Sequence, residues 1–488
     1  MGTQSRTTKT VILSLGKALT SVSGLAATIV LVRLFSKSDF ATFRQTLLVF
    51  GMVSPFLGMG LGRSVIYFVP TATKKRQGAI LLEALGPLLL AGLAYYFFMV
   101  FGGSRLAAQI WNNPRLEDSL ILFAPIAVLS LTHSILSPGL IATHKVSLAA
   151  AIGVISGISV ALVSTIFTLF IPEIEITLFS RILVHCAIAL LGIAVLVSSF
   201  SFEKPTFGGA TKQLAFGLPL CFAAAVTVVS KNMDRAMVSA LCSLENYAIF
   251  DRGAFELPLV AVVTGSMTTI LLVDFRTLFE QGRMDEILRL LHRSVEKSAL
   301  FLMPTMCFLF VLAPELISCM FGEQYLESYK IFQIYLLLLP NRTIVFSAIA
   351  VAAGKTKQLA WVSFLALFAN FVLSYAAISI LGHIGGAIST VVVIYFVSGF
   401  LRATIAKNAL DCSMAKFLPV ATIFRTIGLA MIPLGPVFVC LYVAEDANSF
   451  IRLFVSLAVY MTGLMAVYWH QGFVSWSTLQ RFLFSRKN

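Results

Sequence analysis

Long apolar stretches recur along the whole chain, and they limit the possible folds more than any other feature of the sequence. The stretch "AAIGVISGISVALVSTIFTLF" has no charged side chain and is apolar on every face. A helix of about 20 such residues crosses the roughly 30 Å hydrocarbon core of a bilayer. Outer-membrane β-strands instead alternate apolar and polar residues. The sequence therefore predicts an all-α membrane protein.

The composition supports the same class. Of the 488 residues, 58% are hydrophobic and only 12% are charged, and the mean hydropathy is +0.91. This leaves too little polar surface to cover a water-soluble globule. The net charge of +14 would suggest nucleic acid as the partner of a soluble protein. Here we assign the charge to loops between spans, and we expect no nucleic-acid partner.

Charged, proline and glycine breaks divide the chain into about fourteen predicted transmembrane helices. The first could be mistaken for a signal peptide, but it is too long and lacks a small-residue cleavage site. The predicted spans are 11–35, 43–69, 79–101, 118–141, 147–171, 178–200, 212–240, 246–273, 297–321, 330–352, 358–381, 384–405, 417–443 and 450–470.

The loops alternate in charge. Loops such as "TKKRQ" and "GKTKQ" and the terminal "RFLFSRKN" are basic, whereas "PEIEI" and "AEDANS" are acidic. Counted over alternate loops, about twenty Lys and Arg stand against about six, and cytoplasmic loops carry the excess of these residues. We therefore expect both termini to be cytoplasmic.

One sizeable hydrophilic insertion, Arg276–Ser298, interrupts the apolar stretches. In Arg276–Ser298, apolar residues fall at helical spacing, which predicts either a helix on the cytoplasmic lipid surface or a solvated connector. The seven cysteines lie in or beside apolar segments without a CxxC pair, so we expect small hydrophobic side chains and no metal site.

Two short segments repeat at a nearly constant separation. "LFSKSDFATFRQ" (Leu34–Gln45) matches "LCSLENYAIFDR" (Leu241–Arg252) about 207 residues later. "IATHKVSLA" (Ile141–Ala149) matches "AAGKTKQLA" (Ala352–Ala360) about 210 residues later. The sequence therefore predicts two six-helix lobes with pseudo-symmetry, a design that places a substrate cavity between the lobes of transporters.

The domain boundaries follow from this repeat. We predict an N-terminal lobe at residues 1–201, a cytoplasmic linker at 202–212, a C-terminal lobe at 213–405, and two appended spans with a cytoplasmic tail at 406–488.

The segments "LGKALTSVSGLAATIVLVRLFSKSDFATFRQ" and "GLGRSVIYFVP" resemble the start of the polysaccharide transporters, the O-antigen and oligosaccharide flippases of the multidrug, oligosaccharidyl-lipid and polysaccharide exporter superfamily. "IAVAAGKTKQ" and "LGHIGGAISTVVV" resemble later segments of that family. The family usually has a glycine where this chain has Ala41. The resemblance covers essentially the whole chain.

This resemblance implies a function. Members move a polyprenyl-diphosphate-linked oligosaccharide, such as an O-antigen, capsule or exopolysaccharide repeat unit, across the bacterial inner membrane. It also implies a polysaccharide polymerase and assembly proteins as partners. A flippase for the lipid-linked peptidoglycan precursor and a multidrug exporter of the same superfamily are alternatives. A membrane polysaccharide polymerase or ligase is an alternative of a different class.

Arg342 is the most informative intramembrane charge. It lies about twelve residues from either end of its predicted span, roughly 18 Å from either surface, which is too far for an arginine side chain to reach. We therefore expect Arg342 to line the cavity, or else to pair with an acid such as Glu256. The repeat places Thr132, beside His133, opposite Arg342, so His133 is a second cavity candidate.

Further charges could bind the diphosphate or take part in ion coupling, and each has a simpler explanation. Lys231, Asp234 and Arg235 share one helix face, where they would contact substrate or neutralise one another. The remaining candidates are Lys17, Arg63 and Arg252 for substrate and Glu256, with Asp234, for ion coupling; each of the basic three could equally sit at a membrane boundary.

The chain carries no catalytic motif for ATP hydrolysis or acyl transfer, since HExxH, GxSxG and Walker A sequences do not occur. We therefore expect a transporter without a cofactor. Its energy would come from an ion gradient, the membrane potential or consumption of the product.

Overall fold

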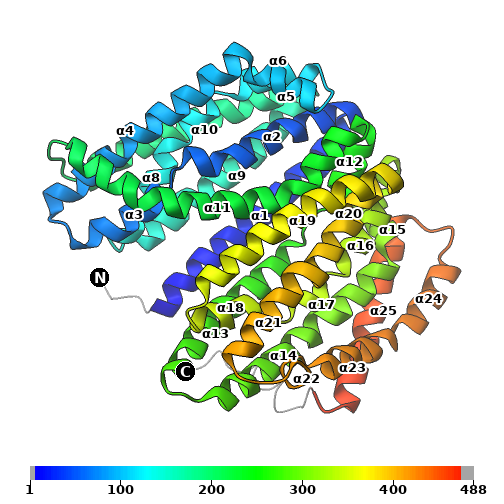
Figure 1. Cartoon of the computed structure of the whole chain (residues 1–488). Helices are drawn as coiled ribbons and strands as arrows, with labels where there is room; N and C mark the ends of the chain where they lie inside the picture. The colour runs from blue at the N-terminus through cyan, green and yellow to red at the C-terminus, as the bar shows by residue number, and fades with distance from the viewer. Residues whose placement is uncertain (1–5, 474–488) are drawn as a thin grey trace, which may run out of the picture. The chain divides into compact units, whose positions relative to one another are not determined.

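The computed structural model describes residues 6–473, and all of the regular structure in these residues is helical (Figure 1). This confirms the predicted fold class. The helices of the first half are α1 Arg6–Leu34, α2 Lys37–Leu57, α3 Leu61–Phe68, α4 Lys74–Phe98, α5 Ser104–Ile110, α6 Arg115–Phe123, α7 Ile126–Leu129, α8 Leu131–Ala142, α9 Val146–Phe170, α10 Ile174–Ser199, α11 Phe207–Leu241 and α12 Leu244–Gly253. Those of the second half are α13 Pro258–Glu280, α14 Met284–Val311, α15 Ala313–Phe321, α16 Ser328–Leu336, α17 Leu339–Arg342, α18 Phe346–Ala352, α19 Thr356–Leu381, α20 His383–Val392, α21 Phe400–Ala409, α22 Met414–Phe417, α23 Val420–Met431, α24 Leu434–Val443 and α25 Ser449–His470.

Twelve helical stretches of the described chain are long and apolar enough to cross a bilayer. The two other predicted spans correspond to α1, whose apolar part is Ala18–Leu34, and to α12 with α13, which are separated by a break at residues 254–257. The count of fourteen therefore stays a prediction. Large apolar side chains such as Phe101 and Phe170 are exposed on the helices, as expected for surfaces that face lipid.

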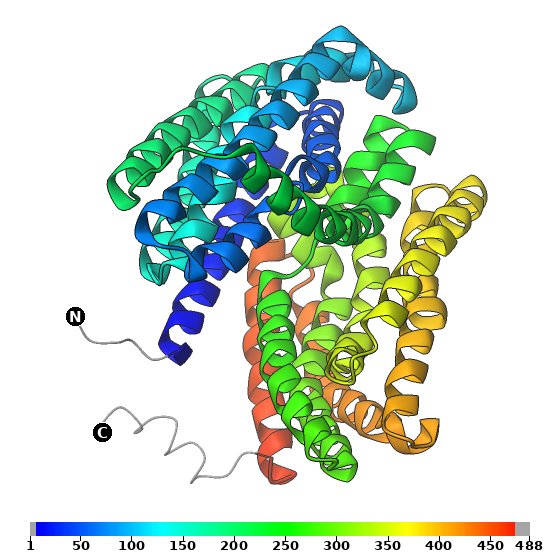
Figure 2. The ribbon, with the colours of Figure 1, turned by 60° about the vertical axis from the view of Figure 1, so that its left-hand side comes forward.

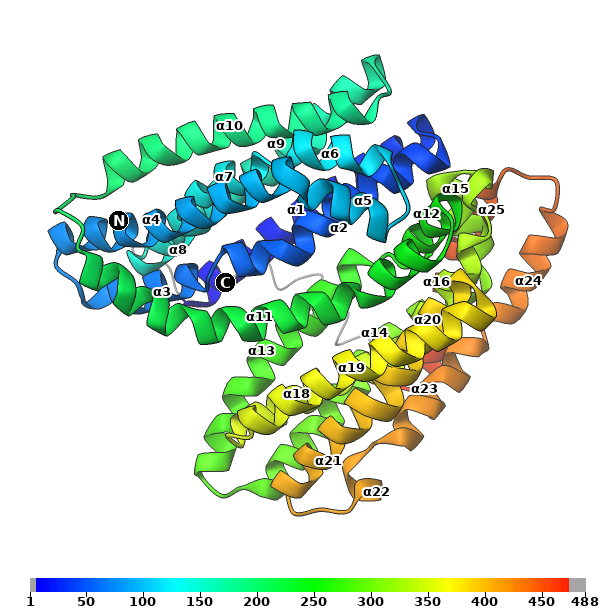
Figure 3. The ribbon, with the colours of Figure 1, turned by 45° about the horizontal axis from the view of Figure 1, so that its top comes forward.

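The chain divides into two compact units. The first comprises Met1–Asp251, Leu257–Val262 and Ser363–Gly386; the second comprises Arg252–Glu256, Val263–Val362 and Ala387–Asn488. In the first unit α4, α8, α9 and α10 pack side by side (Figure 3), because Leu81, Leu136 and their neighbours form a shared apolar core. Helix α11 packs along α2, α3 and α4 (Figure 1).

In the second unit the last helices pack against α14 and α15 (Figure 2). The hydroxyl of Tyr460 on α25 donates to the carbonyls of Pro304 and Ala430. The hydroxyl of Tyr468, about two turns further along α25, donates to the carbonyl of Leu300. The predicted appended spans are therefore tied to this unit by buried hydrogen bonds. The lobe boundaries predicted from the repeat stay a prediction.

The prediction of a surface helix in Arg276–Ser298 is wrong. The segment contains the end of α13, a turn and the first half of α14, which continues as a single helix to Val311. Ile287, Leu291 and Val295 are fully buried. The apolar side chains at helical spacing thus face protein, because α23 packs against α14, and a face next to another helix buries the same residues as a face on lipid.

The first repeated segment adopts the same helix start twice. The Ser36 hydroxyl accepts a hydrogen bond from the backbone N–H of Asp39 at the start of α2, and the Ser243 hydroxyl accepts one from Asn246 at the start of α12. Such a side chain satisfies a backbone donor that the helix itself leaves unpaired. The identical serines of the repeat therefore have identical structural roles.

The second repeated segment also adopts one backbone conformation twice. His144 (φ 62°) and Gly354 (φ 74°) both take a left-handed conformation. The N–H of Lys145 donates to the carbonyl of Leu140, and that of Lys355 donates to Ala350. These contacts end the two helices in the same way. Two independent segments thus support the internal repeat.

Candidate functional site

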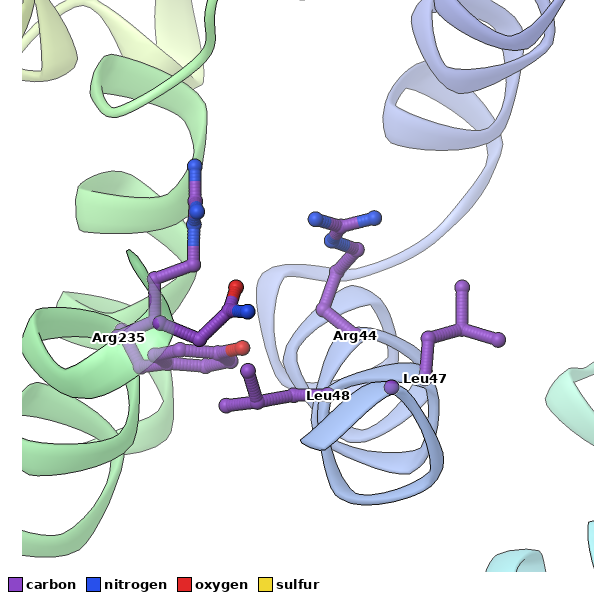
Figure 4. Close-up of a pocket in the computed structure, with 7 residues that line it drawn as sticks. Arg44, Leu47, Leu48 and Arg235 are labelled. Atoms are coloured by element: carbon purple, nitrogen blue, oxygen red, sulfur yellow. The ribbon is translucent and has the colours of Figure 1, made fainter. Parts of the chain in front are cut away.

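A small cavity lies in the first unit between α2 and α11. Its volume is about 130 Å³, and its lining residues are Arg44, Leu47, Leu48, Gly51, Asn232, Arg235 and Tyr247. The side chains of Arg44 and Arg235 point to the same side of the cavity, with Leu48 between the two helices (Figure 4). The cavity therefore combines two guanidinium groups with an apolar floor.

A buried carboxylate binds both arginines. Asp251, at the end of α12, accepts hydrogen bonds from Nε (2.7 Å) and Nη2 (3.1 Å) of Arg44, and Nε of Arg235 lies 3.3 Å from its Oδ1. The Asp251 side chain is fully buried, while those of Arg44 and Arg235 are 27% and 21% exposed. Two positive charges and one negative charge leave this cluster with a net charge of +1.

Neutral hydrogen bonds hold α2 in place beside the cluster. The amide of Gln45 donates to the Ser239 hydroxyl (2.9 Å), and the amide of Asn113 donates to Gln45 Oε1 (2.6 Å) and to Thr42 (2.9 Å). These groups are buried, so their hydrogen bonds replace lost contacts with water. The network positions Arg44, which is the neighbour of Gln45 in the chain.

One further basic side chain, that of Arg181, lies near Arg44 in the first unit. The guanidinium of Arg181 on α10 lies 4.9 Å from the ring centre of Phe43, close enough to Arg44 for the two charges to repel. Its Nε is buried and has no hydrogen-bond partner among the described residues. The predicted candidate His133 is partly buried on α8, and its Nδ1 also has no partner there.

The structure pairs Arg342 with Glu256, which is the alternative that the sequence left open for this residue. Arg342 ends the short helix α17, and Glu256 lies in the break between α12 and α13. The two side chains are 35% and 53% exposed, so the pair is only partly buried. Helix breaks at membrane depth occur where protein or water satisfies the backbone.

The other predicted candidates lie in different surroundings. Lys231 and Arg63 are exposed, and Asp234 is buried with its carboxylate accepting from the N–H of Arg235. Arg252 is buried, with its guanidinium 5.3 Å from the ring centre of Phe321. The side chain of Lys17 lies outside the described part of the chain. Of the nine predicted site residues, the cavity therefore contains Arg235.

Sequence reasoning missed Arg44 and Asp251 as site residues. A signal was nevertheless present, because these residues occupy the same position in the two repeated segments and carry opposite charges. Matched positions in a repeat need not meet in space, so this signal marked the two residues without showing that they bind each other.

Buried ionisable groups also lie at the opposite end of α11. Glu83 of α4 is buried and accepts hydrogen bonds from the backbone N–H and the hydroxyl of Thr206, both 2.8 Å long. Arg76 completes the set with an ion pair of 2.7 Å. The two hydrogen bonds from Thr206, which caps α11, therefore tie α4 to the start of α11.

Comparisons with known proteins identify the family and the fold. A family model described as polysaccharide biosynthesis protein matches residues 30–330. The structure is similar to that of the lipid II flippase MurJ in an inward closed conformation, with a TM-score of 0.75, 15% sequence identity and coverage of 94% of this chain and 99% of that chain.

Two further solved structures share the architecture. An inward-facing multidrug resistance MATE family transporter of the MOP superfamily has a TM-score of 0.62 and 14% identity, with coverage of 84% and 96% of the two chains. A MOP superfamily transporter from Pyrococcus furiosus has a TM-score of 0.57 and 13% identity, with coverage of 83% and 96%. No curated protein sequence matches the chain. The chain is therefore a multi-pass membrane protein that belongs to the polysaccharide biosynthesis protein family and has the fold of MOP superfamily transporters.

Proposed function

We propose that the protein is a flippase that moves a polyprenyl-diphosphate-linked oligosaccharide across the bacterial inner membrane. The observation that carries this proposal is the cavity with Arg44 and Arg235 in a chain of the polysaccharide biosynthesis family. The lipid tail of such a substrate can remain in hydrocarbon during transfer, whereas its diphosphate cannot. A flippase must therefore offer the diphosphate cationic groups along its path, and the predicted topology places this cavity toward the outer end of that path.

The chemistry of the cavity suits a phosphoryl group. Guanidinium groups bind phosphate oxygens through paired N–H donors, and these charge-assisted hydrogen bonds are stronger than neutral ones. The volume of about 130 Å³ is small beside the roughly 300–1,000 Å³ of sites that enclose drug-sized ligands, which suits a phosphoryl group better than a whole glycan. The net charge of +1 further favours an anion.

The mechanism that we propose is alternating access. The two predicted lobes, at residues 1–201 and 213–405, would rock so that the substrate site opens first to the cytoplasm and then to the outer side. Both termini would be cytoplasmic in this arrangement. Arg342 and the other predicted candidates stay proposed contacts on the path, and Asp234 and Glu256 stay proposed sites of ion coupling.

The competing functions make different demands on this cavity. An exporter of cationic drugs needs an acidic or aromatic site, whereas two guanidinium groups line this one. A flippase for the lipid-linked peptidoglycan precursor would use the same diphosphate contacts, so the sugar must be tested directly. A polymerase or ligase would need catalytic groups in a substantial external loop, and the predicted outer loops are short.

Transport in proteoliposomes tests the proposal. A fluorescent polyprenyl-diphosphate oligosaccharide is placed in the membrane, and its transfer is followed by a quencher that reaches only one leaflet. We expect Arg44→Ala to slow transfer about tenfold or more, because one lost hydrogen bond to a charged group costs about 1.5–3 kcal/mol. Arg342→Ala is measured in the same assay.

The matched control is Arg105→Ala, because Arg105 is 72% exposed and lies 3.5 Å from Glu117 on the surface. We expect this variant to transfer the lipid at the wild-type rate. Equal transfer by Arg44→Ala and wild type, at equal protein levels, would remove the cavity from the mechanism. Transfer of the lipid-linked peptidoglycan precursor in preference to the oligosaccharide would favour the alternative substrate.

A further inference from the structure

The two residues at matched positions of the internal repeat bind each other. Arg44 and Asp251 are 207 residues apart, which is the separation of the repeated segments. Each follows a buried phenylalanine, Phe43 and Phe250, at the same place in α2 and α12. The first repeat thus contributes a cation to this position and the second contributes an anion.

We propose that Asp251 is a tethered counter-anion that holds Arg44 when no substrate is bound, and that the substrate diphosphate releases it by competing for the same guanidinium. This inference rests on the proposed function and adds a specificity-determining residue to it. Asp251 would act on the ligand through Arg44, as an internal competitor that also locks the two repeats together.

The geometry supports competition. Arg44 both lines the cavity and donates from Nε and Nη2 to Asp251. Asp251 occupies the paired donors Nε and Nη2 of the Arg44 guanidinium, so a ligand that binds Arg44 through the same pair must displace the carboxylate. Because both ligands are anions, each weakens the hold of Arg44 on the other.

The charges explain why the competitor selects for a diphosphate. A single carboxylate neutralises one of the two positive charges of Arg44 and Arg235. An anion of charge −1 gains no charge advantage over Asp251. The Asp251 carboxylate that it displaces is fully buried, so it is costly for this carboxylate to lose its arginine partners. A diphosphate carries at least two negative charges and can engage both guanidinium groups. The nearby Arg181 raises the positive potential further.

The surrounding contacts indicate which bond can act as the lock. The Gln45 amide donates to the Ser239 hydroxyl, and Trp111 Nε1 donates to the carbonyl of Ala236 (3.1 Å); both bonds join α11 to elements of the first repeat. None of these residues lines the cavity, so a ligand bound there leaves both bonds in place. Among the described contacts between α2 and the second repeat, the Arg44–Asp251 pair is the one that a diphosphate can replace.

Ligand binding by purified protein in detergent tests the inference. The probe is farnesyl diphosphate, titrated into wild type and Asp251→Asn by calorimetry. We expect Asp251→Asn to lower Kd about tenfold, equivalent to about 1.4 kcal/mol, because the amide keeps the shape of the carboxylate without its charge. Transport by the same variant should fall, since the lock between the repeats is lost.

The control and the contrary outcomes are specific. Glu117→Gln removes a surface carboxylate, 34% exposed, and should leave Kd unchanged. A purely structural ion pair predicts weaker binding by Asp251→Asn, and an equal or higher Kd overturns the inference. If Asp251→Asn does not fold, Asp251→Ser is titrated with farnesyl diphosphate instead. Its Kd should fall in the same way, and an equal or higher Kd overturns the inference.

Wild-type protein that binds no farnesyl diphosphate and transfers no lipid-linked oligosaccharide would contradict the proposed function itself. Wild-type binding with no gain in Asp251→Asn would contradict only the role of Asp251. The two failures are therefore distinguishable.

Discussion

At the scale of single residues, burial determines which carboxylates matter for stability. The Glu83 side chain is 1% exposed and is bound by Thr206 and Arg76. We expect Glu83→Gln to lower the free energy of unfolding by about 1–3 kcal/mol, because Arg76 loses its ionic partner and a buried acceptor loses its charge. Thermal unfolding in detergent, followed by tryptophan fluorescence, measures the change as a lower Tm.

Glu117→Gln is the matched control for this prediction. Its pair with Arg105 is 3.5 Å long and exposed, and surface pairs contribute about 0–1 kcal/mol. Its Tm should therefore stay close to that of wild type. Equal Tm values for Glu83→Gln and wild type would show that the carboxylate does not tie α4 to α11.

Residue positions in the candidate site were only partly predictable from the sequence. Arg235 and Arg342 were recognised because a charge inside an apolar stretch is conspicuous. Arg44 was not, because it stands close to the predicted start of its span, and Asp251 differs from it in charge. Which charged groups meet depends on how α2, α11 and α12 pack, and a one-dimensional pattern does not contain that information.

At the scale of helices, a close approach of two glycines joins α2 and α3 to α11. A Cβ added at Gly217 of α11 would lie 2.5 Å from the carbonyl oxygen of Met59, and one added at Gly60 would meet the backbone of Gly217. Gly60 also has a φ of 67°, which favours glycine. Small residues at such contacts let transmembrane helices approach closely.

This contact predicts opposite effects for two similar substitutions on α11. Gly217→Ala should destabilise the protein by about 1–3 kcal/mol, because the added methyl group meets backbone atoms. Gly208→Ala should stabilise it by about 0.5–1 kcal/mol. A Cβ added at Gly208 meets no atom within 4 Å, and alanine favours the helix. Thermal unfolding of both variants checks the signs. A higher Tm for Gly217→Ala would rule out the close approach.

Helix identity was predictable to a large extent, and helix partners were not. Each predicted span contains a helix, since about 20 apolar residues allow few alternatives in lipid. The segment Arg276–Ser298 shows the limit. Its spacing indicated a helix with one apolar face, and the structure packs that face against protein, where Ile287 and Leu291 are buried. Periodicity specifies a face and does not specify what covers it.

At the scale of the whole molecule, charge asymmetry predicts how the chain lies in the membrane. The turn before α4 leads into Lys74, Lys75 and Arg76, whereas the turn before α10 contains Glu173 and leads into Glu175. Lys and Arg are retained on the cytoplasmic side. The two turns are therefore expected on opposite sides, and with an even number of spans we expect both termini to be cytoplasmic.

Reporter fusions test this orientation together with the two spans that the apolar-length criterion leaves open. We expect green fluorescent protein to fluoresce after Asn488 and after Gly282, and alkaline phosphatase to be active after Ser36, Ser243 and Glu173, because the first folds in the cytoplasm and the second outside it. Activity after Ser36 requires α1 to cross the membrane, and a change of side between Ser243 and Gly282 requires α12 with α13 to cross. Phosphatase activity after Asn488 would instead give an odd number of spans. Such a result would exclude two lobes of six spans with two appended helices, because that arrangement returns the C-terminus to the side of the N-terminus.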